Sequence, residues 1–233
     1  MHDPKEITVG TKNSIAKNIN HQYYIVGARE RYNVLRAVIS LNSDIFGCIF
    51  CRTKIETQKV ADKLINDGYR AGAIHGDLSQ NQRDAVMKSF RKKRIQLLVA
   101  TDVAARGIDV DDITHVINYQ LPDEVEVYTH RSGRTGRAGK QGTSIIFVTK
   151  SDQRKIKLIE NKLQIKLAKQ EMPSAELILS KKVMVWVDQI KNTSVKNDLN
   201  IYLPKVVESF ENIDKKNLIE LMLSREFKNF NLN

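Results

Sequence analysis

The sequence contains no run of apolar residues approaching the roughly 20 that a transmembrane helix needs. Residues 1–6 form neither the apolar core of a signal peptide nor an arginine-rich transit pattern. Only two cysteines occur among 233 residues, which excludes a fold built on disulfide bonds. These absences predict a cytoplasmic chain with no membrane partner, long enough for one full domain with a hydrophobic core and an appendage.

The two cysteines, Cys48 and Cys51, form a C-x-x-C motif, a pattern that can bind zinc or carry thioredoxin-like redox chemistry. They lie in an apolar segment, 46–51, that is typical of a buried strand. Successive side chains of a strand alternate between its faces, so residues three apart point to opposite sides. Because no second Cys or His pair lies nearby, we expect both thiols to pack in the core and predict no metal site.

The net charge of +11 is confined to one part of the chain. Residues 1–170 hold 29 Lys and Arg against 18 Asp and Glu, whereas residues 171–233 hold nine of each. A basic surplus attracts polyanions, so the larger part is expected to bind nucleic acid or nucleotide. A surplus that serves only solubility is the alternative.

Residues 1–18 are polar and are expected to be a linker that enters from upstream. From 19 to 169 the chain alternates short apolar runs with amphipathic helical patterns, which predicts an α/β fold with a mostly parallel sheet covered by helices on both faces. Such folds place their chemistry on the loops at the carboxyl ends of the strands. The expected strands are 22–26, 47–51, 71–74, 96–100, 114–118 and 143–148, and the expected helices lie near 29–41, 54–66, 80–91, 123–131 and 151–163.

Local signals mark two helix starts and one helix end. Thr53 with Glu56, and Ser79 with Gln82, match the capping box, in which side chain and backbone of two residues bond reciprocally. Gly68 stands where a left-handed residue is expected to end the first of these helices.

Residues 170–233 are predicted to form a small all-α extension, with helices at 175–191, at 200–210 and, capped by Asp214, at 215–227. Of the residues from 171 onward, 28 are apolar. Helices of three or four turns cannot bury this many apolar side chains among themselves. We therefore predict that 175–233 pairs with a second copy of the chain, with a helical cap on the parent domain as the alternative.

The densest chemical signal lies between Tyr128 and Gly139. Arg131, Arg134 and Arg137 recur every third residue and alternate with glycines. Guanidinium groups bind phosphate oxygens bidentately, and glycine lets a phosphate approach the backbone closely. The pattern therefore predicts a phosphate site rather than a solvated basic loop.

Two further segments carry polar residues at predicted strand ends. The strand at 97–100 runs into Thr101 and Asp102, where a hydrogen-bonding role toward a ligand competes with ordinary capping of the strand. His75, Gly76 and Asp77 form a turn just before a helix, an arrangement that favours anions.

In this order the segments resemble the C-terminal RecA-like domain of the DEAD-box RNA helicases of superfamily 2. Ser132 stands where that family usually has an aliphatic residue. The extension resembles, more weakly, the dimerisation region of DeaD/CsdA-type bacterial helicases. The matching segments are 49–53 for motif IV, 75–77 with Gln80 and Arg83 for motif IVa, 100–109 for motif V, 130–137 for motif VI, and 116–122 between the last two.

The resemblance implies roles at a nucleotide site. Arg134 and Arg137 would reach the γ-phosphate of ATP, with Arg137 as the arginine finger. His130 would pair across the cleft as the third catalytic residue. Asp109, with Gly107 beside it, would contact the ribose.

The resemblance also implies that RNA is held by its backbone, without sequence specificity. The residues implied are Arg52, Gly76, Asp77, Thr101 and Arg131.

Two parts of a complete ATPase are missing from the sequence: it has no G-x-x-x-x-G-K-[ST] motif and no Asp-Glu-Ala-Asp. The family keeps both in an N-terminal RecA-like domain, which would hold the Mg²⁺ and share the ATP. We therefore expect half of an ATP-driven RNA-unwinding enzyme that is inactive alone. A stand-alone RNA-binding or scaffolding module, or a superfamily 2 DNA helicase, are the alternatives.

Overall fold

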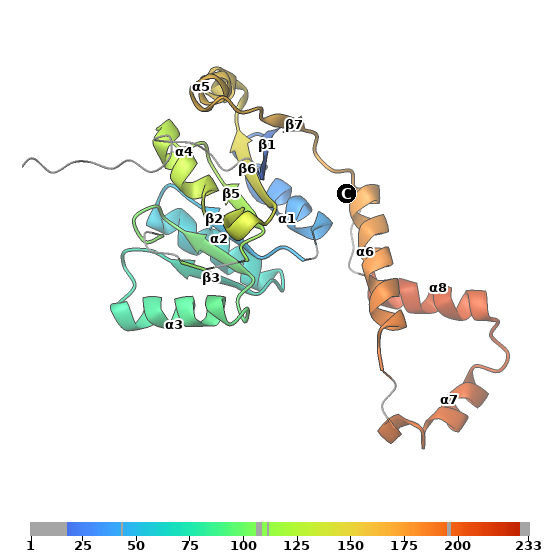
Figure 1. The fold of residues 1–233 in the computed structure, drawn as a ribbon. Helices are drawn as coiled ribbons and strands as arrows, with labels where there is room; N and C mark the ends of the chain where they lie inside the picture. The colour runs from blue at the N-terminus through green and yellow to red at the C-terminus, as the bar shows by residue number, and fades with distance from the viewer. Residues whose placement is uncertain (1–17, 43, 106–108, 111, 195–196, 229–233) are drawn as a thin grey trace, which may run out of the picture. The chain divides into compact units, whose positions relative to one another are not determined.

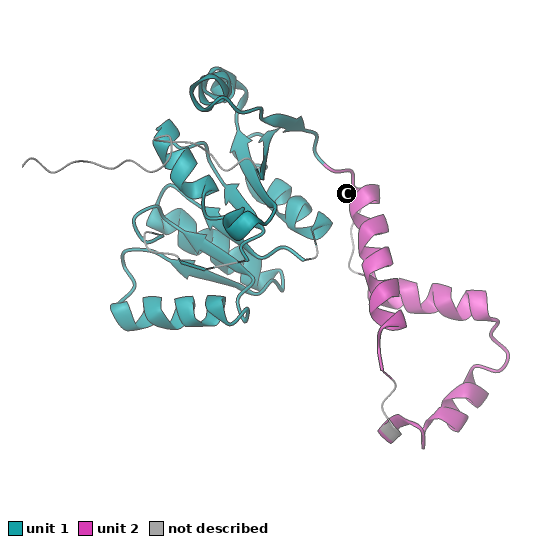
Figure 2. Cartoon of the chain, in the orientation of Figure 1, with its two compact units in different colours: residues 1–172 teal, residues 173–233 magenta. Residues whose placement is uncertain are grey.

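The computed structural model describes residues 18–42, 44–105, 109–110, 112–194 and 197–228 (Figure 1). The chain divides into two compact units, 1–172 and 173–233 (Figure 2). Most of the predicted linker and Gly107 lie outside the described residues.

The first unit is built on a parallel sheet of seven strands in the order β3-β4-β2-β5-β6-β1-β7. This confirms the predicted α/β fold. The prediction missed β7, a three-residue edge strand without an apolar pattern, which pairs with β1. The strands are β1 (Ile19–Ile25), β2 (Gly47–Phe50), β3 (Ala71–Ile74), β4 (Leu97–Ala100), β5 (His115–Asn118), β6 (Gly142–Val148) and β7 (Ala168–Gln170).

Helices cover both faces of the sheet, as Figure 1 shows. One face packs against α1 (Arg31–Leu41) and α2 (Lys54–Asn66). The other packs against α3 (Gln80–Arg91), α4 (Val125–Ser132) and α5 (Gln153–Leu163).

The two cysteines pack on opposite faces of the sheet. Cys48 packs in the core cluster on the α3 side, and Cys51, just past the end of β2, packs in the cluster of α1 and α2. The prediction that they point to opposite faces is confirmed. Burial raises the pKa of the Cys48 thiol to about 12.

The helix-end signals hold with one exception. Ser79 and Gln82 form both bonds of the capping box, at 3.3 and 2.9 Å, and Gly68 has the expected positive φ of +85°. Thr53 accepts a hydrogen bond from the backbone N–H of Glu56 at 3.2 Å. The reciprocal half predicted there is wrong, because the Glu56 carboxylate instead accepts from Gln120 and from the backbone of Arg52.

The second unit contains α6 (Ala175–Lys191), α7 (Leu203–Ser209) and α8 (Lys215–Glu226). Asp214 caps α8, as predicted, by accepting from two backbone N–H groups. None of the described residues of these three helices is buried. The Trp186 and Phe227 rings meet edge to face, with centroids 6.4 Å apart. Within the described part of the chain, every helix is too short or too polar to span a bilayer.

Candidate functional site

Three of the segments singled out in the sequence meet at one edge of the sheet. Arg52 follows β2, Gly76 and Asp77 follow β3, and Thr101 follows β4, and these strands are direct neighbours. Arg52, Gly76 and Asp77 are exposed, and Thr101 is half-buried. A Cβ added at Gly76 would meet nothing within 4 Å. The edge therefore leaves open space beside a backbone that a ligand can approach closely.

Exposed ion pairs hold the charged groups of this edge in place. Lys54 pairs with Asp77 at 2.8 Å. Arg52 donates from Nη2 to Asp123 at 2.9 Å and to the carbonyl of Leu121 at 3.3 Å. Pairs this exposed contribute little to stability, so a phosphate can displace the carboxylates at small cost.

Arg131 is placed differently from the other arginines. Its Nε and Nη2 donate to the two carboxylate oxygens of Asp102 at 2.6 and 2.7 Å, and its Nη1 donates to Asn118 at 2.9 Å. Its guanidinium carbon lies 5.1 Å from the ring centre of Phe50, and only 6% of the side chain is exposed. The buried guanidinium thus ties α4 to the ends of β2, β4 and β5.

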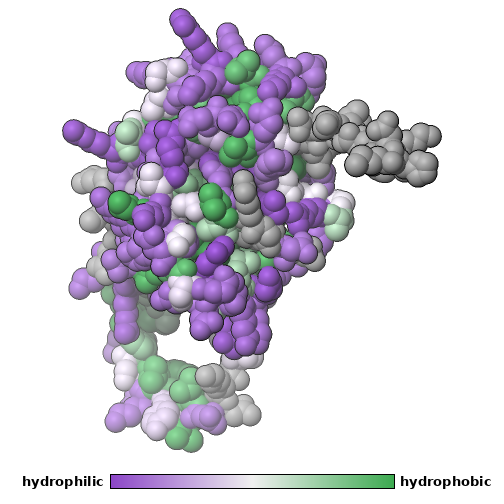
Figure 3. All heavy atoms as spheres, turned by 90° about the vertical axis from the view of Figure 1, so that its left-hand side faces the viewer, coloured by the Kyte–Doolittle hydropathy of each residue, from purple (hydrophilic) through white to green (hydrophobic). Residues whose placement is uncertain are grey.

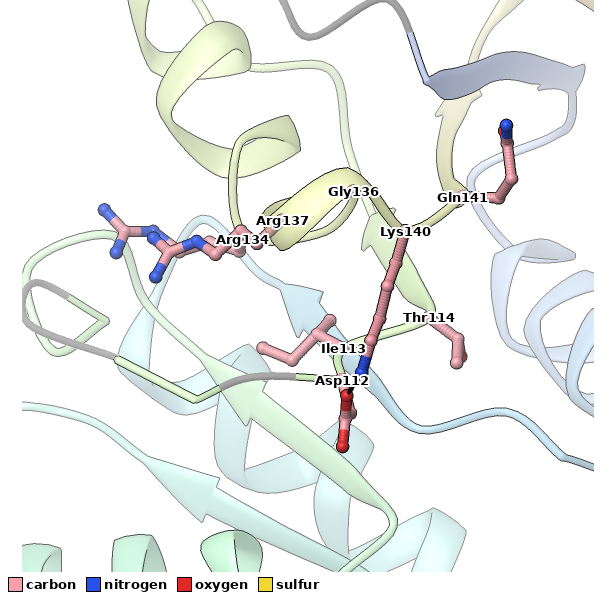
Figure 4. Close-up of a pocket in the computed structure, with 8 residues that line it drawn as sticks. All are labelled: Asp112, Ile113, Thr114, Arg134, Gly136, Arg137, Lys140 and Gln141. Carbon is pink, nitrogen blue, oxygen red and sulfur yellow. Dashed lines mark hydrogen bonds and ion pairs between the residues drawn. The ribbon is translucent and has the colours of Figure 1, made fainter.

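Arg134 and Arg137 lie beyond the end of α4, in the turn that leads to β6. Their guanidinium groups extend side by side in the same direction (Figure 4). Arg137 donates from Nη1 to Asp109 at 2.9 Å and from Nε to the carbonyl of Gly133 at 3.0 Å. Burial lowers the pKa of Arg134, and the charge of Arg137 acts in the same direction. Two adjacent cations that repel each other favour an anion between them. His130 is exposed on the last turn of α4.

An unusual backbone shapes this turn. Gly136, Ala138 and Gly139 have φ angles of +68°, +52° and +76°. A Cβ at Gly136 would lie 2.7 Å from Ile19, so this position requires glycine. Ala138 carries a side chain in the left-handed region, which costs on the order of 1 kcal/mol or more.

A small pocket of about 130 Å³ opens beside the two arginines (Figure 4). Lys140 also lines it and pairs with Asp112. Pockets that enclose a drug-sized ligand measure about 300–1,000 Å³, so this one is too small to surround a nucleotide. Its cations suit an anion that another surface also holds. Its lining residues are Asp112, Ile113, Thr114, Arg134, Gly136, Arg137, Lys140 and Gln141.

Ser132 belongs to a buried chain of hydrogen bonds that sequence reasoning missed. Its hydroxyl bonds that of Ser144 at 2.9 Å, Ser144 donates to the Tyr128 hydroxyl at 3.3 Å, and that hydroxyl lies 2.6 Å from Nδ1 of His21. Burial lowers the pKa of His21 to about 4, so its ring is neutral near pH 7. The signal was Ser132, which stands where the related family usually has an aliphatic residue.

No group of three or more potential metal ligands occurs among the described residues.

Comparison with known proteins places the fold in a defined class. Residues 30–139 match the family model "Helicase conserved C-terminal domain". Residues 178–232 match "Probable ATP-dependent RNA helicase, helical domain". The chain therefore contains a helicase C-terminal domain of RecA-like fold.

Curated relatives of the chain identify the kind of helicase more closely. The DEAD-box ATP-dependent RNA helicase CshA of Bacillus subtilis is 35% identical over 214 residues, which cover 92% of this chain and 43% of that protein. The chain thus spans less than half the length of this curated relative.

Solved structures of DEAD-box proteins are also similar to this chain. A DEAD-box protein of Methanococcus jannaschii is 45% identical, with a TM-score of 0.61 over 66% of this chain and 42% of that chain. The Escherichia coli DEAD-box protein SrmB, bound to regulator of ribonuclease activity A, is 31% identical, with a TM-score of 0.60 over 70% of this chain and 95% of that chain. Dbp5 of S. cerevisiae, bound to RNA and ADP BeF3, is 28% identical, with a TM-score of 0.69 over 79% and 49%. The chain belongs to the DEAD-box RNA helicase family. The DeaD/CsdA subtype stays a prediction.

Proposed function

We propose that this chain supplies the second half of the ATP and RNA site of an ATP-dependent RNA helicase that unwinds RNA duplexes. An N-terminal RecA-like domain in cis would hold the ATP and its Mg²⁺. The observation that carries the proposal is the pair of guanidinium groups of Arg134 and Arg137, which extend in the same direction beside a pocket too small to enclose a nucleotide. Such a pair fits the terminal phosphate of a nucleotide bound mainly by another surface.

Arg137 is the proposed arginine finger. In the structure its guanidinium binds Asp109 at 2.9 Å, and the Asp109 side chain is 87% exposed. Arg137 would exchange this carboxylate for the γ-phosphate, and Asp109 would turn to the ribose hydroxyls with Gly107 beside it. Arg134 would add a second cation, and exposed His130 would reach across the cleft to the other domain.

RNA would lie along the open sheet edge. Arg52 and Thr101 would bind backbone phosphates, and Gly76 and Asp77 would let the strand approach the turn after β3. Arg131 is buried against Asp102, so we assign it to positioning α4 instead of the RNA contact that its sequence position implies. The RNA in the similar Dbp5 structure supports an RNA ligand for this fold.

The second unit is proposed to pair with a second copy of the chain, in the cytoplasm. The support is the exposure of the apolar side chains on its helices and in the segment before α7, which two-fold pairing would cover. Those more than half exposed are Leu177, Met184, Leu199, Ile201, Tyr202, Leu203, Val207 and Leu221. Light scattering of the 26.6 kDa chain at micromolar concentration tests this, and a monomer mass unchanged by truncation after Pro173 would favour the cap.

The ATPase role is tested in the full-length protein. Arg137→Ala is expected to lower kcat for RNA-stimulated ATP hydrolysis by about 10³ or more, the scale of a lost arginine finger, with little change in RNA affinity without nucleotide. Arg91→Ala, an exposed arginine on α3, is the matched control. A kcat within a factor of two of wild type would refute the role and favour an RNA-binding module. The 233-residue chain alone is expected to show no ATPase activity.

A further inference from the structure

A second basic surface begins where the candidate RNA edge ends. Between residues 150 and 169 the chain carries seven Lys and Arg against two Asp and Glu. This segment holds α5 and β7, at the top of the view in Figure 1. Hydrophilic side chains project from the same height of the molecule in Figure 3. The segment therefore carries nearly half of the net charge of the chain.

Three cations at and just before the start of α5 have no acidic partners among the described residues. Lys150, Arg154 and Lys157 are exposed, and none of them lies within 4 Å of a carboxylate among the described residues. Lys155, by contrast, pairs with Asp123, just before α4, at 3.9 Å, and Lys162 pairs with Glu126 of α4 at 2.7 Å. Unpaired cations that converge on one surface attract polyanions and lose that attraction as salt rises.

One carboxylate oxygen joins the α5 surface to the candidate RNA edge. Oδ1 of Asp123 lies 2.9 Å from Nη2 of Arg52 and 3.9 Å from Nζ of Lys155. Arg52 is a proposed RNA contact, and the Asp123 side chain is 71% exposed. An exposed carboxylate between two cations occupies the place where a phosphate oxygen would bind both.

The sheet order explains why these groups form a row. β2, β5 and β6 are neighbours, and Arg52, Asp123 and Lys150 follow their carboxyl ends in that order. Parallel strands lie about 4.8 Å apart, so the row from Arg52 to Lys150 spans roughly 10 Å. A single strand that follows a row of this length can place more than one of its phosphates against it.

We propose that Lys150, just before α5, and Arg154 and Lys157 of α5, with Arg52 and Lys155 at Asp123, form a phosphate track that continues the RNA site along the sheet edge. The inference rests on the proposed RNA function. It adds the path that the RNA strand takes beyond Arg52. The ligand is the sugar–phosphate backbone of the same RNA strand, so recognition is independent of sequence.

The test is fluorescence anisotropy on the 233-residue chain with labelled uridine strands of six and twenty nucleotides. The variant Lys150→Gln/Arg154→Gln/Lys157→Gln removes three positive charges that make no described ion pair. Lys88→Gln/Arg91→Gln/Lys92→Gln, exposed residues at the end of α3, removes the same charge elsewhere. Thermal melts check that both variants fold.

We expect the α5 variant to weaken binding of the twenty-nucleotide strand at least tenfold at low salt and to reduce its salt slope by about 2. This follows from a loss of about 0.7 in slope for each single-strand phosphate contact. Binding of the six-nucleotide strand and the α3 control should change less than twofold. Asp123→Asn, which frees Arg52 and Lys155, should tighten binding of the long strand.

Three results would overturn the track. If the α5 variant binds the twenty-nucleotide strand within twofold of the wild-type affinity, the cations of α5 face solvent and do not bind RNA. Equal losses in the two triple variants would mean a general effect of net charge. Equal losses for both strand lengths would place α5 inside the core RNA site. Absence of RNA binding by the wild-type chain would instead refute the proposed function itself, and the track with it.

Discussion

Removal of the Asp102 carboxylate tests whether the buried ion pair of Arg131 stabilises the packing of α4 on the sheet. Asp102→Ala deletes both oxygens that bind the guanidinium at 2.6 and 2.7 Å. Arg131, with 6% of its side chain exposed, then keeps only the amide of Asn118, at 2.9 Å, as a polar partner among the described residues. The substitution leaves a buried charge largely unpaired.

The magnitude follows from the burial of the two partners. Breaking a fully buried ion pair by removing one partner costs about 3–5 kcal/mol. The Asp102 side chain is 44% exposed, so water reaches the site and can solvate part of the stranded charge. We therefore expect the free energy of unfolding of the first unit to fall by about 2 kcal/mol. For a domain of this size, that lowers Tm by about 4–8 °C.

Urea denaturation of the chain measures this loss, and two other variants calibrate it. Asp77→Ala breaks the exposed pair with Lys54 and should cost less than about 1 kcal/mol. Asp102→Ala with Arg131→Met removes the stranded charge as well and should recover part of the stability. Trp186, the single tryptophan, lies in the second unit, so its fluorescence should report an unchanged transition. If Asp102→Ala lowers the free energy of unfolding by no more than Asp77→Ala does, the ion pair of Arg131 does not stabilise the packing of α4.

Three further outcomes follow from burial. Cys48 and Cys51 should both resist a thiol reagent at pH 8 in the folded chain and both react in guanidinium, because burial raises each thiol pKa; fast labelling of either in the folded chain would contradict their core positions. Burial lowers the pKa of His21 and of His115 to about 4, so unfolding, which restores about 6.5, takes up protons between these values. The free energy of unfolding should therefore fall with decreasing pH in that window, by up to about 1.4 kcal/mol per pH unit for each histidine, and His21→Gln should flatten the profile. Gly47→Ala would place a methyl 2.8 Å from the backbone oxygen of His115 and should cost about 1–3 kcal/mol in urea denaturation, whereas no loss would mean that β2 and β5 can separate locally.

The core strands could be predicted because burial on both faces leaves a mark in the sequence. Apolar runs such as 97–100 alternate with amphipathic helices at a spacing that only a parallel sheet satisfies. β7 leaves no such mark. Its three residues, Ala-Lys-Gln, form a strand because they pair with β1 at the sheet edge, and this contact is tertiary, not local.

The candidate site was only partly predictable for a related reason. The spacing of Arg131, Arg134 and Arg137 suggests three equivalent phosphate ligands. However, α4 ends at Ser132, so Arg131 lies on a helix that packs on the sheet and the other two lie in the turn beyond it. A regular spacing in sequence thus crosses a helix end, where the direction of the side chains changes. Asp102, which binds Arg131, lies 29 residues away in sequence, and no local pattern links the two.

The charge distribution matches the two tasks proposed for the two units. Residues 1–170 carry the whole net charge of +11, and residues 171–233 carry none. A unit that binds phosphates gains from this surplus, because the potential attracts the ligand before contact. A surface that pairs with its own copy would be opposed by the same surplus, since like charges would meet across the two-fold axis. The neutral, apolar second unit avoids this repulsion, so the proposed self-association would not be opposed by the charge that the proposed phosphate site requires.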